Sequence, residues 1–382
     1  MTKRLPLCLG LALQLFAMPA AKALNGPAEI PVAGNTLQIS GGIDGYVYGQ
    51  SDTAPKGEPD ASAVGDSPYG ANLANALISL QKSSGLLQFT LQLGPVDGLP
   101  VLGTVPPKAS LHVYRFSPLY LGYVTIAPKG SPFTISIGQI SSLEGYEGGL
   151  DWQNANIFAS SMWYISNQNS LGILGTYTQG PWSVSVAYGD GADTRVFNFL
   201  QAAVTYNTSG ANALTLFYGG SVGRTGLNAT TYMGMPVSDA PFLINSHMFG
   251  AYDSFTDGKL NLVPEIQYIY APTDHQVMID KYTSNFSAAL FSDYQFGNSD
   301  YSLGGMISYF DNIGGQANWY IAPRAEGVGL ELTPTWQHNH LFARLSVGYV
   351  HLFNTGTDDP AFGSNGTSRD VVQSALEVGY LF

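Results

Sequence analysis

The chain has 382 residues, of which 45% are hydrophobic and only 11% are Asp, Glu, Lys or Arg, less than half the charged share that is usual for a soluble globular domain. Glycine at 45 residues, tyrosine at 23 and phenylalanine at 19 favour β-strands joined by tight turns and argue against a helical bundle. The formal net charge of −12 argues against nucleic acid as a natural partner.

The N-terminus has the pattern of an export signal. Two basic residues precede an apolar stretch over 5–18, and Ala21-Lys22-Ala23 offers a small-x-small cleavage site. The apolar stretch is shorter than the ~20 residues that a membrane-spanning helix needs. We therefore predict a cleaved signal peptide over 1–23 and a mature protein over 24–382, with 12 basic and 27 acidic residues and a net charge of −15.

Apolar residues alternate with small or polar ones in many segments of the mature chain. One example is Trp182, Val184 and Val186, which alternate with Ser183 and Ser185. Since successive side chains of a strand point to opposite faces, each such segment is predicted to be a strand with one apolar face. In chain order, the sixteen predicted strands are 37–49, 74–82, 86–94, 112–126, 132–140, 170–178, 182–190, 197–207, 212–224, 244–256, 259–271, 282–296, 299–311, 324–337, 340–353 and 370–382.

The connections between these strands alternate in length. Short turns such as 257–258 and 297–298 alternate with long loops such as 141–169 and 354–369. Apolar alternation alone would also fit a soluble sandwich, but the few charges, the aromatic residues at strand ends and the unequal connections favour a membrane barrel. We therefore predict an all-β fold, a transmembrane antiparallel β-barrel of about sixteen strands, in contact with the lipids of the bacterial outer membrane.

The last ten residues, 373–382, alternate in the same way and end on an aromatic residue. Tyr380 and Phe382 lie on the apolar face of this predicted strand. The pattern resembles the C-terminal assembly signal of bacterial outer-membrane barrels. We therefore predict that the barrel-assembly machinery recognises Tyr380 and Phe382.

The connection 141–169 is predicted to fold into the barrel as a constriction loop, because a sixteen-stranded barrel leaves an aqueous lumen that must be narrowed to be selective. A solvated surface loop is the alternative. Charges on the strands should point inward, since a cation facing lipid at mid-depth would cost ~2–4 kcal/mol. The predicted constriction consists of Glu144, Glu147, Asp151, Trp152, Asn154 and Asn156 in the loop and of Glu331 and Arg344 on strands.

No catalytic site, metal site or cofactor is predicted. The only cysteine, Cys8, lies in the predicted signal peptide. The segment 219–223 matches G-x-S-x-G, but no predicted helix follows it and no histidine is expected at a strand position that matches Ser221. His338 and His340 stand in a predicted turn without a carboxylate alongside. Four loop aspartates leave a loop-bound calcium ion open: Asp190, Asp193, Asp358 and Asp359.

Short motifs near the start of the mature chain and around the loop 141–169 carry a family resemblance. They are Gly41-Gly42-Ile43-Asp44-Gly45-Tyr46-Val47-Tyr48, Gly138-Gln139-Ile140, Leu143-Glu144-Gly145-Tyr146-Glu147, Asn154, Asn156, Phe158, Ser160, Ser161 and Leu171-Gly172-Ile173. Together they resemble the OmpL-like putative β-barrel porin family of Gram-negative bacteria, over nearly the whole mature chain. The resemblance implies a passive channel, and porins of this general kind are often homotrimers.

The predicted function is therefore a porin, a water-filled channel for passive diffusion of small hydrophilic solutes. Its acidic lining should favour cations weakly. Two alternatives stay open, namely a structural or adhesion barrel with a plugged lumen and an outer-membrane enzyme of the lipase type. The inward strand positions are mostly Gly, Ser, Ala and Thr, which leave room for water and favour the channel.

Overall fold

The computed structural model describes residues 27–32, 35–107, 118–167, 169–191, 194–227, 229, 240–315, 317, 319–356 and 360–382. The predicted signal peptide, 1–23, lies outside the described residues, and so does most of the first half of the predicted strand 112–126. None of the helices in the described part of the chain has both the length and the apolar character needed to cross a membrane.

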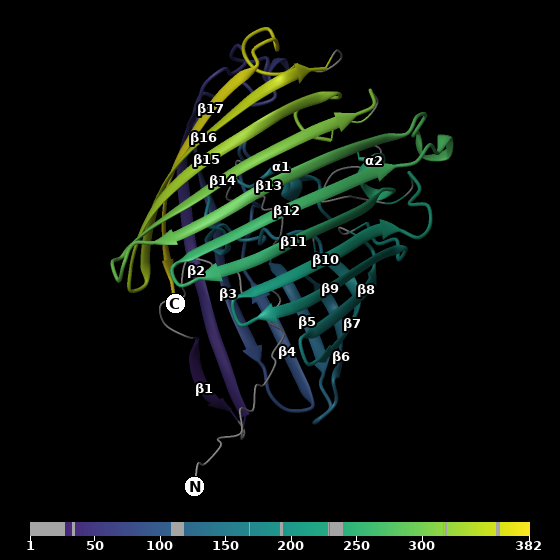
Figure 1. Ribbon diagram of the computed structural model, residues 1–382, viewed down its shortest axis with the longest axis vertical. Helices are drawn as coiled ribbons and strands as arrows, with labels where there is room; N and C mark the ends of the chain where they lie inside the picture. Colours follow the sequence, from purple (N-terminus) through teal and green to yellow (C-terminus); the bar gives the residue numbers. More distant parts are fainter. Residues whose placement is uncertain are drawn as a thin grey trace.

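Sixteen antiparallel strands, β2 to β17, form one closed barrel (Figure 1). Consecutive strands pair with each other, and β17 closes the ring by pairing with β2. The barrel strands are β2 (Asn35–Gln50), β3 (Tyr69–Lys82), β4 (Leu87–Leu93), β5 (Leu119–Ile126), β6 (Phe133–Ile140), β7 (Ser170–Gln179), β8 (Trp182–Gly189), β9 (Phe199–Ser209), β10 (Asn212–Ser221), β11 (His247–Asp257), β12 (Leu260–Ala271), β13 (Thr283–Gln295), β14 (Tyr301–Ile313), β15 (Ala325–His338), β16 (Leu341–Thr355) and β17 (Asp370–Leu381).

The predicted fold class and the sixteen predicted barrel strands are confirmed, with bounds that differ by a few residues in most strands. One further strand, β1 (Ala28–Val32), was not predicted and pairs with the start of β2 outside the ring. Its five residues include Pro31 and are too few to show a clear alternation. Two short helices, α1 (Ser161–Ile165) and α2 (Pro241–Ile244), lie in connections between strands.

The two faces of the barrel wall differ in chemistry, as the alternation predicts. On β15 and β16 the outward residues Leu332 and Val347 are 58% and 50% exposed in the isolated chain. The residues next to them in sequence, Glu331, Thr333 and Ser346, point inward and are buried. Apolar side chains cover the outside of the ring, which suits it to lipid. Its inside is mixed, because apolar wall residues such as Phe217 and Phe310 are buried there together with the polar ones.

Aromatic side chains gather near both ends of the outer surface. At the end with the short turns, the rings of Trp182 and Tyr206 lie 4.4 Å apart. At the end with the long loops, the rings of Tyr218 and Phe249 lie 5.1 Å apart. Amphipathic rings prefer the membrane–water interface, so the two groups mark the two faces of the bilayer.

Backbone hydrogen bonds close the barrel down to the last residue. The amide of Phe382 donates to the carbonyl of Gly41 at 2.9 Å, and the amide of Gly41 donates to the carbonyl of Phe382 at 2.8 Å. The short turns at this end use glycine where the backbone enters the left-handed region, as at Gly258 with φ +59°. The C-terminal residue is therefore part of the seam between the last strand and the first.

Candidate functional site

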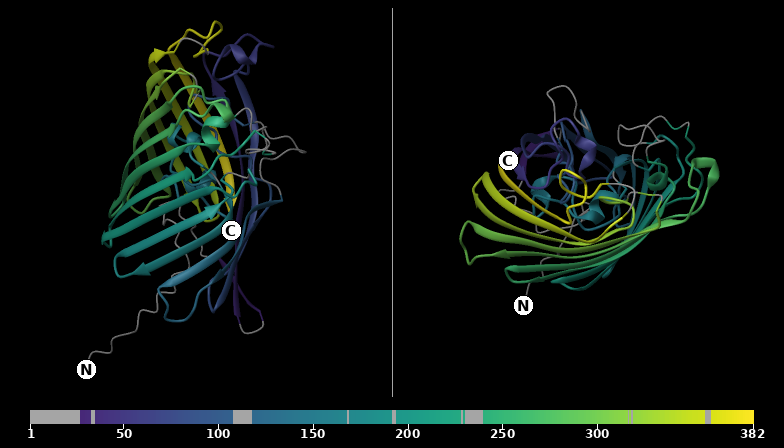
Figure 2. Two further views of the ribbon diagram at one scale, coloured as in Figure 1. Left: turned by 90° about the vertical axis from the view of Figure 1, so that its right-hand side faces the viewer. Right: turned by 90° about the horizontal axis from the view of Figure 1, so that it is seen from above.

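Residues 141–167 and 169, here called the β6–β7 segment, run inside the barrel (Figure 2). The segment contains η2 (Asp151–Gln153) and α1, whose N-cap Ser160 accepts hydrogen bonds from two backbone amides of the helix. Leu143, Ile157 and Met162 are each 1% exposed, because they pack against other apolar side chains within the ring. The segment is thus a packed element, whereas a solvated surface loop would leave such residues open to water.

Hydrogen bonds tie the β6–β7 segment to inward-facing residues on separate parts of the wall. Their polar partners come from strands β9, β12, β15 and β16, so that the segment reaches widely separated parts of the ring. The bonds run from Leu143 N to Gln201 Oε1 (2.7 Å), from Tyr146 N to Glu265 Oε2 (3.3 Å), from Phe158 N to Glu331 Oε1 (3.0 Å) and from Arg344 Nη1 to Asn154 O (2.7 Å).

The two glutamates of this segment accept hydrogen bonds from the protein. Glu144 accepts a hydrogen bond from the amide of Asn167 at 2.7 Å, and burial raises its pKa to about 8. Glu147 accepts from the amide of Ser160 at 2.9 Å and from its hydroxyl, and burial raises its pKa to about 7. Because both pKa values are raised, the packed segment is most stable at low pH and loses stability as the pH rises towards these values.

Glycine at position 219 makes room for Glu144. A Cβ atom at this position would overlap the Oε1 atom of Glu144. Gly219 belongs to the G-x-S-x-G match, and its close approach to the segment accounts for the residue without any catalytic role.

Asp151 lies against the seam of the barrel and is fully buried. Burial and then the charge of the neighbouring Glu377 raise the pKa of its carboxyl. Trp152, the next residue, packs against a cluster that includes Leu77 and Tyr120. Both residues thus contact the wall close to where β17 meets β2.

The two asparagines have different partners. The side chain of Asn154 bonds to the backbone of its own segment, accepting from Gly148 N at 2.8 Å and donating to Gly148 O at 2.9 Å. Asn156 instead accepts from Thr333 Oγ1 on the wall at 3.2 Å. Asn154 therefore fixes the local turn, and Asn156 helps to hold the segment against β15.

The two predicted strand residues, Glu331 and Arg344, point into the barrel. Glu331 accepts hydrogen bonds from Phe158 N and from the hydroxyl of Ser346. Arg344 forms a buried ion pair with Glu377, in which the two side chains are 1% and 0% exposed, and its Nε donates to Glu377 Oε2 at 2.9 Å. All eight predicted residues thus lie inside the barrel. The acids do not converge on one water-filled gap, because Glu144, Glu147 and Glu331 bond to the surrounding protein and Asp151 is buried at the seam.

A second inward segment, residues 94–107 between β4 and β5, was missed from the sequence. Val96, Leu99 and Leu102 are at most 3% exposed. This β4–β5 segment lies beside the β6–β7 segment, with Leu102 N donating to Ala159 O at 3.1 Å and Ala159 N donating to Pro100 O at 2.8 Å. Its apolar residues in a connection rich in glycine and proline were the available signal, since a loop in water has little reason to carry them.

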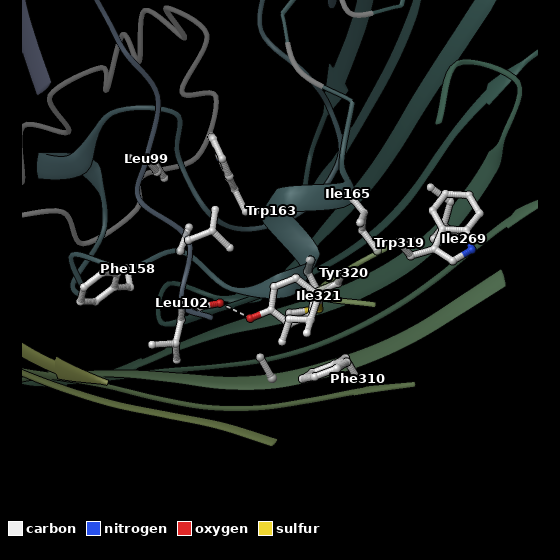
Figure 3. Close-up of a cluster of buried hydrophobic side chains, with 14 of the residues drawn as sticks. Leu99, Leu102, Phe158, Trp163, Ile165, Ile269, Phe310, Trp319, Tyr320 and Ile321 are labelled. Carbon is white, nitrogen blue, oxygen red and sulfur yellow. Dashed lines mark hydrogen bonds between the residues drawn. The ribbon is translucent and has the colours of Figure 1, made fainter. Parts of the chain in front are cut away.

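The connection between β14 and β15 also enters the barrel. Trp319 and Tyr320 are 2% exposed, and the hydroxyl of Tyr320 donates to the carbonyl of Leu102. Figure 3 shows the ring of Tyr320 above Phe310, with Trp319 on one side and Phe158 on the other. All three inward segments contribute to this apolar cluster. The inside of the barrel is therefore narrowed from several directions, whereas the sequence pointed to one loop.

A cavity of about 500 Å³ opens between the β6–β7 segment and the short turns. Polar and charged side chains make up a large part of its lining, among them Lys259, Asn261, Asp293, Asp300 and Arg344. On the side of the segment towards the long loops, a cavity beside Glu144 measures only about 10 Å³. The β6–β7 segment therefore has a large cavity on its short-turn side and a much smaller one on the side of the long loops.

The residues of the G-x-S-x-G match do not form a nucleophile site. His247 pairs with Gly220 and so lies nearer to Ser221 than predicted. Adjacent residues of a strand point to opposite faces, however, and the hydroxyl of Ser221 donates to the carbonyl of Gly223 whereas His247 bonds to Tyr218 at 3.0 Å. The histidine cannot take a proton from the serine in this arrangement.

Comparisons with known proteins agree with the barrel. The sequence profile of the family described as Putative beta-barrel porin-2, OmpL-like, matches residues 36–382. No protein of the curated set matches the chain.

Solved structures show the same fold at low sequence identity. The outer membrane channel DcaP of Acinetobacter baumannii has a TM-score of 0.61 and 10% identity, over 93% of this chain and 100% of that chain. An anion-selective porin from Comamonas acidovorans has a TM-score of 0.58 and 12% identity, over 91% and 99%. OmpT of Vibrio cholerae in its trimer form has a TM-score of 0.54 and 11% identity, over 91% and 99%.

Proposed function

Since this chain belongs to the Putative beta-barrel porin-2, OmpL-like family, we propose that it is a porin through which small hydrophilic solutes diffuse passively. Membership places the protein in the bacterial outer membrane and among channels, not enzymes. The observation that carries the proposal is the polar cavity of about 500 Å³, which leads from the short-turn end of the barrel to the β6–β7 segment.

The β6–β7 segment is the proposed constriction. It crosses the lumen between widely separated strands, and the cavity on its short-turn side, about 500 Å³, is far larger than the one of about 10 Å³ beside Glu144. Solutes would move down their gradient through the water that remains, at a rate set by this narrow region. The β4–β5 and β14–β15 segments narrow the same lumen and would lower the size limit further.

A barrel with a closed lumen is the second candidate. The apolar cluster around Tyr320 and Phe158 favours it, because apolar side chains fill part of the space that a wide channel would leave to water. Conductance across a planar lipid bilayer distinguishes the two functions. We expect discrete current steps from the purified barrel, and a panel of sugars of increasing size in liposome swelling should show a low size limit. A correctly folded barrel that passes neither ions nor sugars would instead support the closed structure.

We further propose a weak preference for cations that depends on pH. Carboxyl groups gain negative charge as the pH rises through their pKa values, which are about 8 for Glu144 and about 7 for Glu147. The ionisable groups that face them are acids and phenols: Asp190 and Tyr218 near Glu144, and Glu265, Glu331 and Tyr320 near Glu147. Ionisation therefore adds negative charge to a region that offers little to neutralise it.

The reversal potential in a gradient of potassium chloride measures this preference. We expect the preference for potassium over chloride to grow as the pH is raised through these two pKa values. The double variant E144Q/E147Q should keep a nearly constant reversal potential over the same range, because its amides do not ionise. A wild-type reversal potential that is independent of pH, or one that changes equally in the double variant, would contradict the role of these two glutamates.

We also propose that the protein is exported and assembled as its sequence predicts. Residues 1–23 act as a signal peptide in a Gram-negative bacterium, the mature protein is 24–382, and the barrel-assembly machinery recognises Tyr380 and Phe382. A homotrimer is proposed because one of the similar porins is described in a trimer form.

Replacing Phe382 with aspartate should lower the amount of barrel in the outer membrane. The substitution removes the terminal aromatic side chain while the backbone bonds between Phe382 and Gly41 can still form. Membrane fractionation with a gel of unheated samples measures the folded barrel, and periplasmic accumulation would show that export itself is intact. The conservative variant F382Y serves as the control and should assemble normally. Equal amounts of F382D and wild-type barrel in the outer membrane would mean that the terminal residue is not recognised.

A further inference from the structure

Three carboxylates from distant parts of the sequence meet inside the barrel, at the seam where the ring closes. Asp44 lies on β2, Glu377 on β17, and Asp151 on the β6–β7 segment between them. One carboxylate oxygen of each lies within 4.8 Å of the other two. All three residues are at most 1% exposed, so water does not screen their mutual repulsion.

The hydrogen-bond donors around this group, here called the seam cluster, are too few for its oxygens. Asn75 Nδ2 donates to Asp44 Oδ1 at 3.0 Å, and Arg344 donates to Glu377 Oε2. Asn75 also lies near Asp151, but among the residues that the structure describes no donor reaches hydrogen-bond geometry with either oxygen of Asp151, with Asp44 Oδ2 or with Glu377 Oε1. Four buried acceptor oxygens are therefore left without partners, at a cost in free energy that a folded protein rarely carries.

The net charge of the seam cluster indicates the charge of an ion that could bind there. The three ionised carboxylates and the single cation Arg344 sum to a net charge of −2. A divalent cation would balance this charge and would accept all four free oxygens as ligands. Hard cations such as Ca²⁺ prefer carboxylate oxygens, and Ca²⁺ tolerates irregular geometry better than Mg²⁺ does.

We propose that Asp44, Asp151 and Glu377 bind one divalent cation, with Ca²⁺ as the preferred ion. The ion would fasten the β6–β7 segment to the first and last strands, because Asp151 supplies two of the free oxygens and the strands supply the others. This site goes beyond the proposed porin function and does not depend on conduction. It needs only the folded barrel.

Terbium luminescence tests the site directly, because Tb³⁺ takes the same oxygen ligands as Ca²⁺. Trp152 adjoins Asp151 in the sequence and can transfer excitation to an ion held there. The mature barrel in detergent is first stripped with a chelator and then titrated with Tb³⁺. We expect one Tb³⁺ per chain, displaced by Ca²⁺ at lower concentrations than by Mg²⁺. No saturable luminescence in the wild-type barrel would overturn the proposal.

Substitutions test whether Tb³⁺ binds at the seam cluster. D151N and D44N should each weaken Tb³⁺ binding at least about tenfold, since even the loss of a residue that only supports a ligand costs that much. E147Q is the matched control, because it removes another buried carboxylate of the same segment that lies outside the cluster. Its affinity for Tb³⁺ should equal that of the wild type. Equal losses in D151N and E147Q would point to a general effect of charge and contradict the site.

Buried carboxylates can also be neutralised by sharing protons. Thermal unfolding distinguishes this possibility from a bound metal ion. Calcium should raise the Tm of the wild-type barrel and of E147Q, but not that of D151N, because a ligand that binds only the folded state stabilises it. If protons alone neutralise the seam cluster, calcium leaves the wild-type Tm unchanged and D151N raises it. This second pattern would overturn the proposal even if all variants fold.

Discussion

Replacing Arg344 with methionine is expected to lower the free energy of unfolding by about 3–5 kcal/mol, the usual cost of removing one partner of a buried ion pair. The guanidinium is the cation that pairs with Glu377, and both side chains are almost fully buried. Its loss leaves the carboxylates of the seam cluster without a positive charge. It also removes the hydrogen bond to Asn154 O that fixes the β6–β7 segment to β16.

Urea or thermal unfolding of the barrel in detergent measures this effect. The double variant R344M/E377Q should recover part of the lost stability, because it removes the carboxylate that R344M leaves unpaired. Lys259, which is exposed in a short turn and bonds to Asn298 Oδ1, provides the control cation. K259M should change the free energy of unfolding by no more than about 0.5 kcal/mol. If R344M behaves like K259M, the ion pair contributes little to the fold.

Deleting residues 148–160 is expected to raise the single-channel conductance several-fold. The deletion removes the backbone groups that bond to Glu331 and Arg344, and with them the part of the β6–β7 segment that bounds the polar cavity. The strands on either side, β6 and β7, pair with each other over eight residues and do not depend on the segment for their hydrogen bonds. The current should therefore rise because the lumen widens while the barrel stays closed.

A second variant replaces the same residues with an equal number of glycines and serines. It keeps the chain length but loses the apolar contacts of Ile157 and Phe158, so its conductance should also rise and its current should be noisier. A gel of unheated samples verifies that both variants form barrels. Unchanged conductance in both would show that the β6–β7 segment is not the constriction, and the β4–β5 and β14–β15 segments would be the next to test.

The barrel wall could be predicted well because its signal is local. In a segment such as Trp182 to Gly189, every second residue is apolar, and this alternation indicates which side chains face outward. Conversely, the inward segments have no such period. Residues 94–107 and Trp319 to Ile321 carry apolar side chains without alternation, and only their packing in the apolar clusters inside the ring explains why those side chains are there.

For the acids of the β6–β7 segment, too, the sequence predicts one part and the packing decides another. The length of the connection and the need to narrow a wide lumen led to the prediction of an inward loop, but the protonation of its acids depends on atoms that lie far away in the sequence. Glu144 has a raised pKa because it is buried where the glycine at position 219 leaves space for it. The sequence alone does not show whether a glutamate is buried, and a glutamate exposed to water is expected to be charged.

The sequence by itself determined the barrel strands and their outward faces, since the repeat of two residues is fixed by the backbone of each strand. The few charges, the aromatic residues at strand ends and the unequal connections then indicated a closed barrel. Only the tertiary structure decided what the barrel encloses. Asp44, Asp151 and Glu377 come together because ring closure pairs the last strand with the first and the β6–β7 segment reaches the same seam. Contacts of this kind depend on the arrangement of whole elements, which no local pattern of residues encodes.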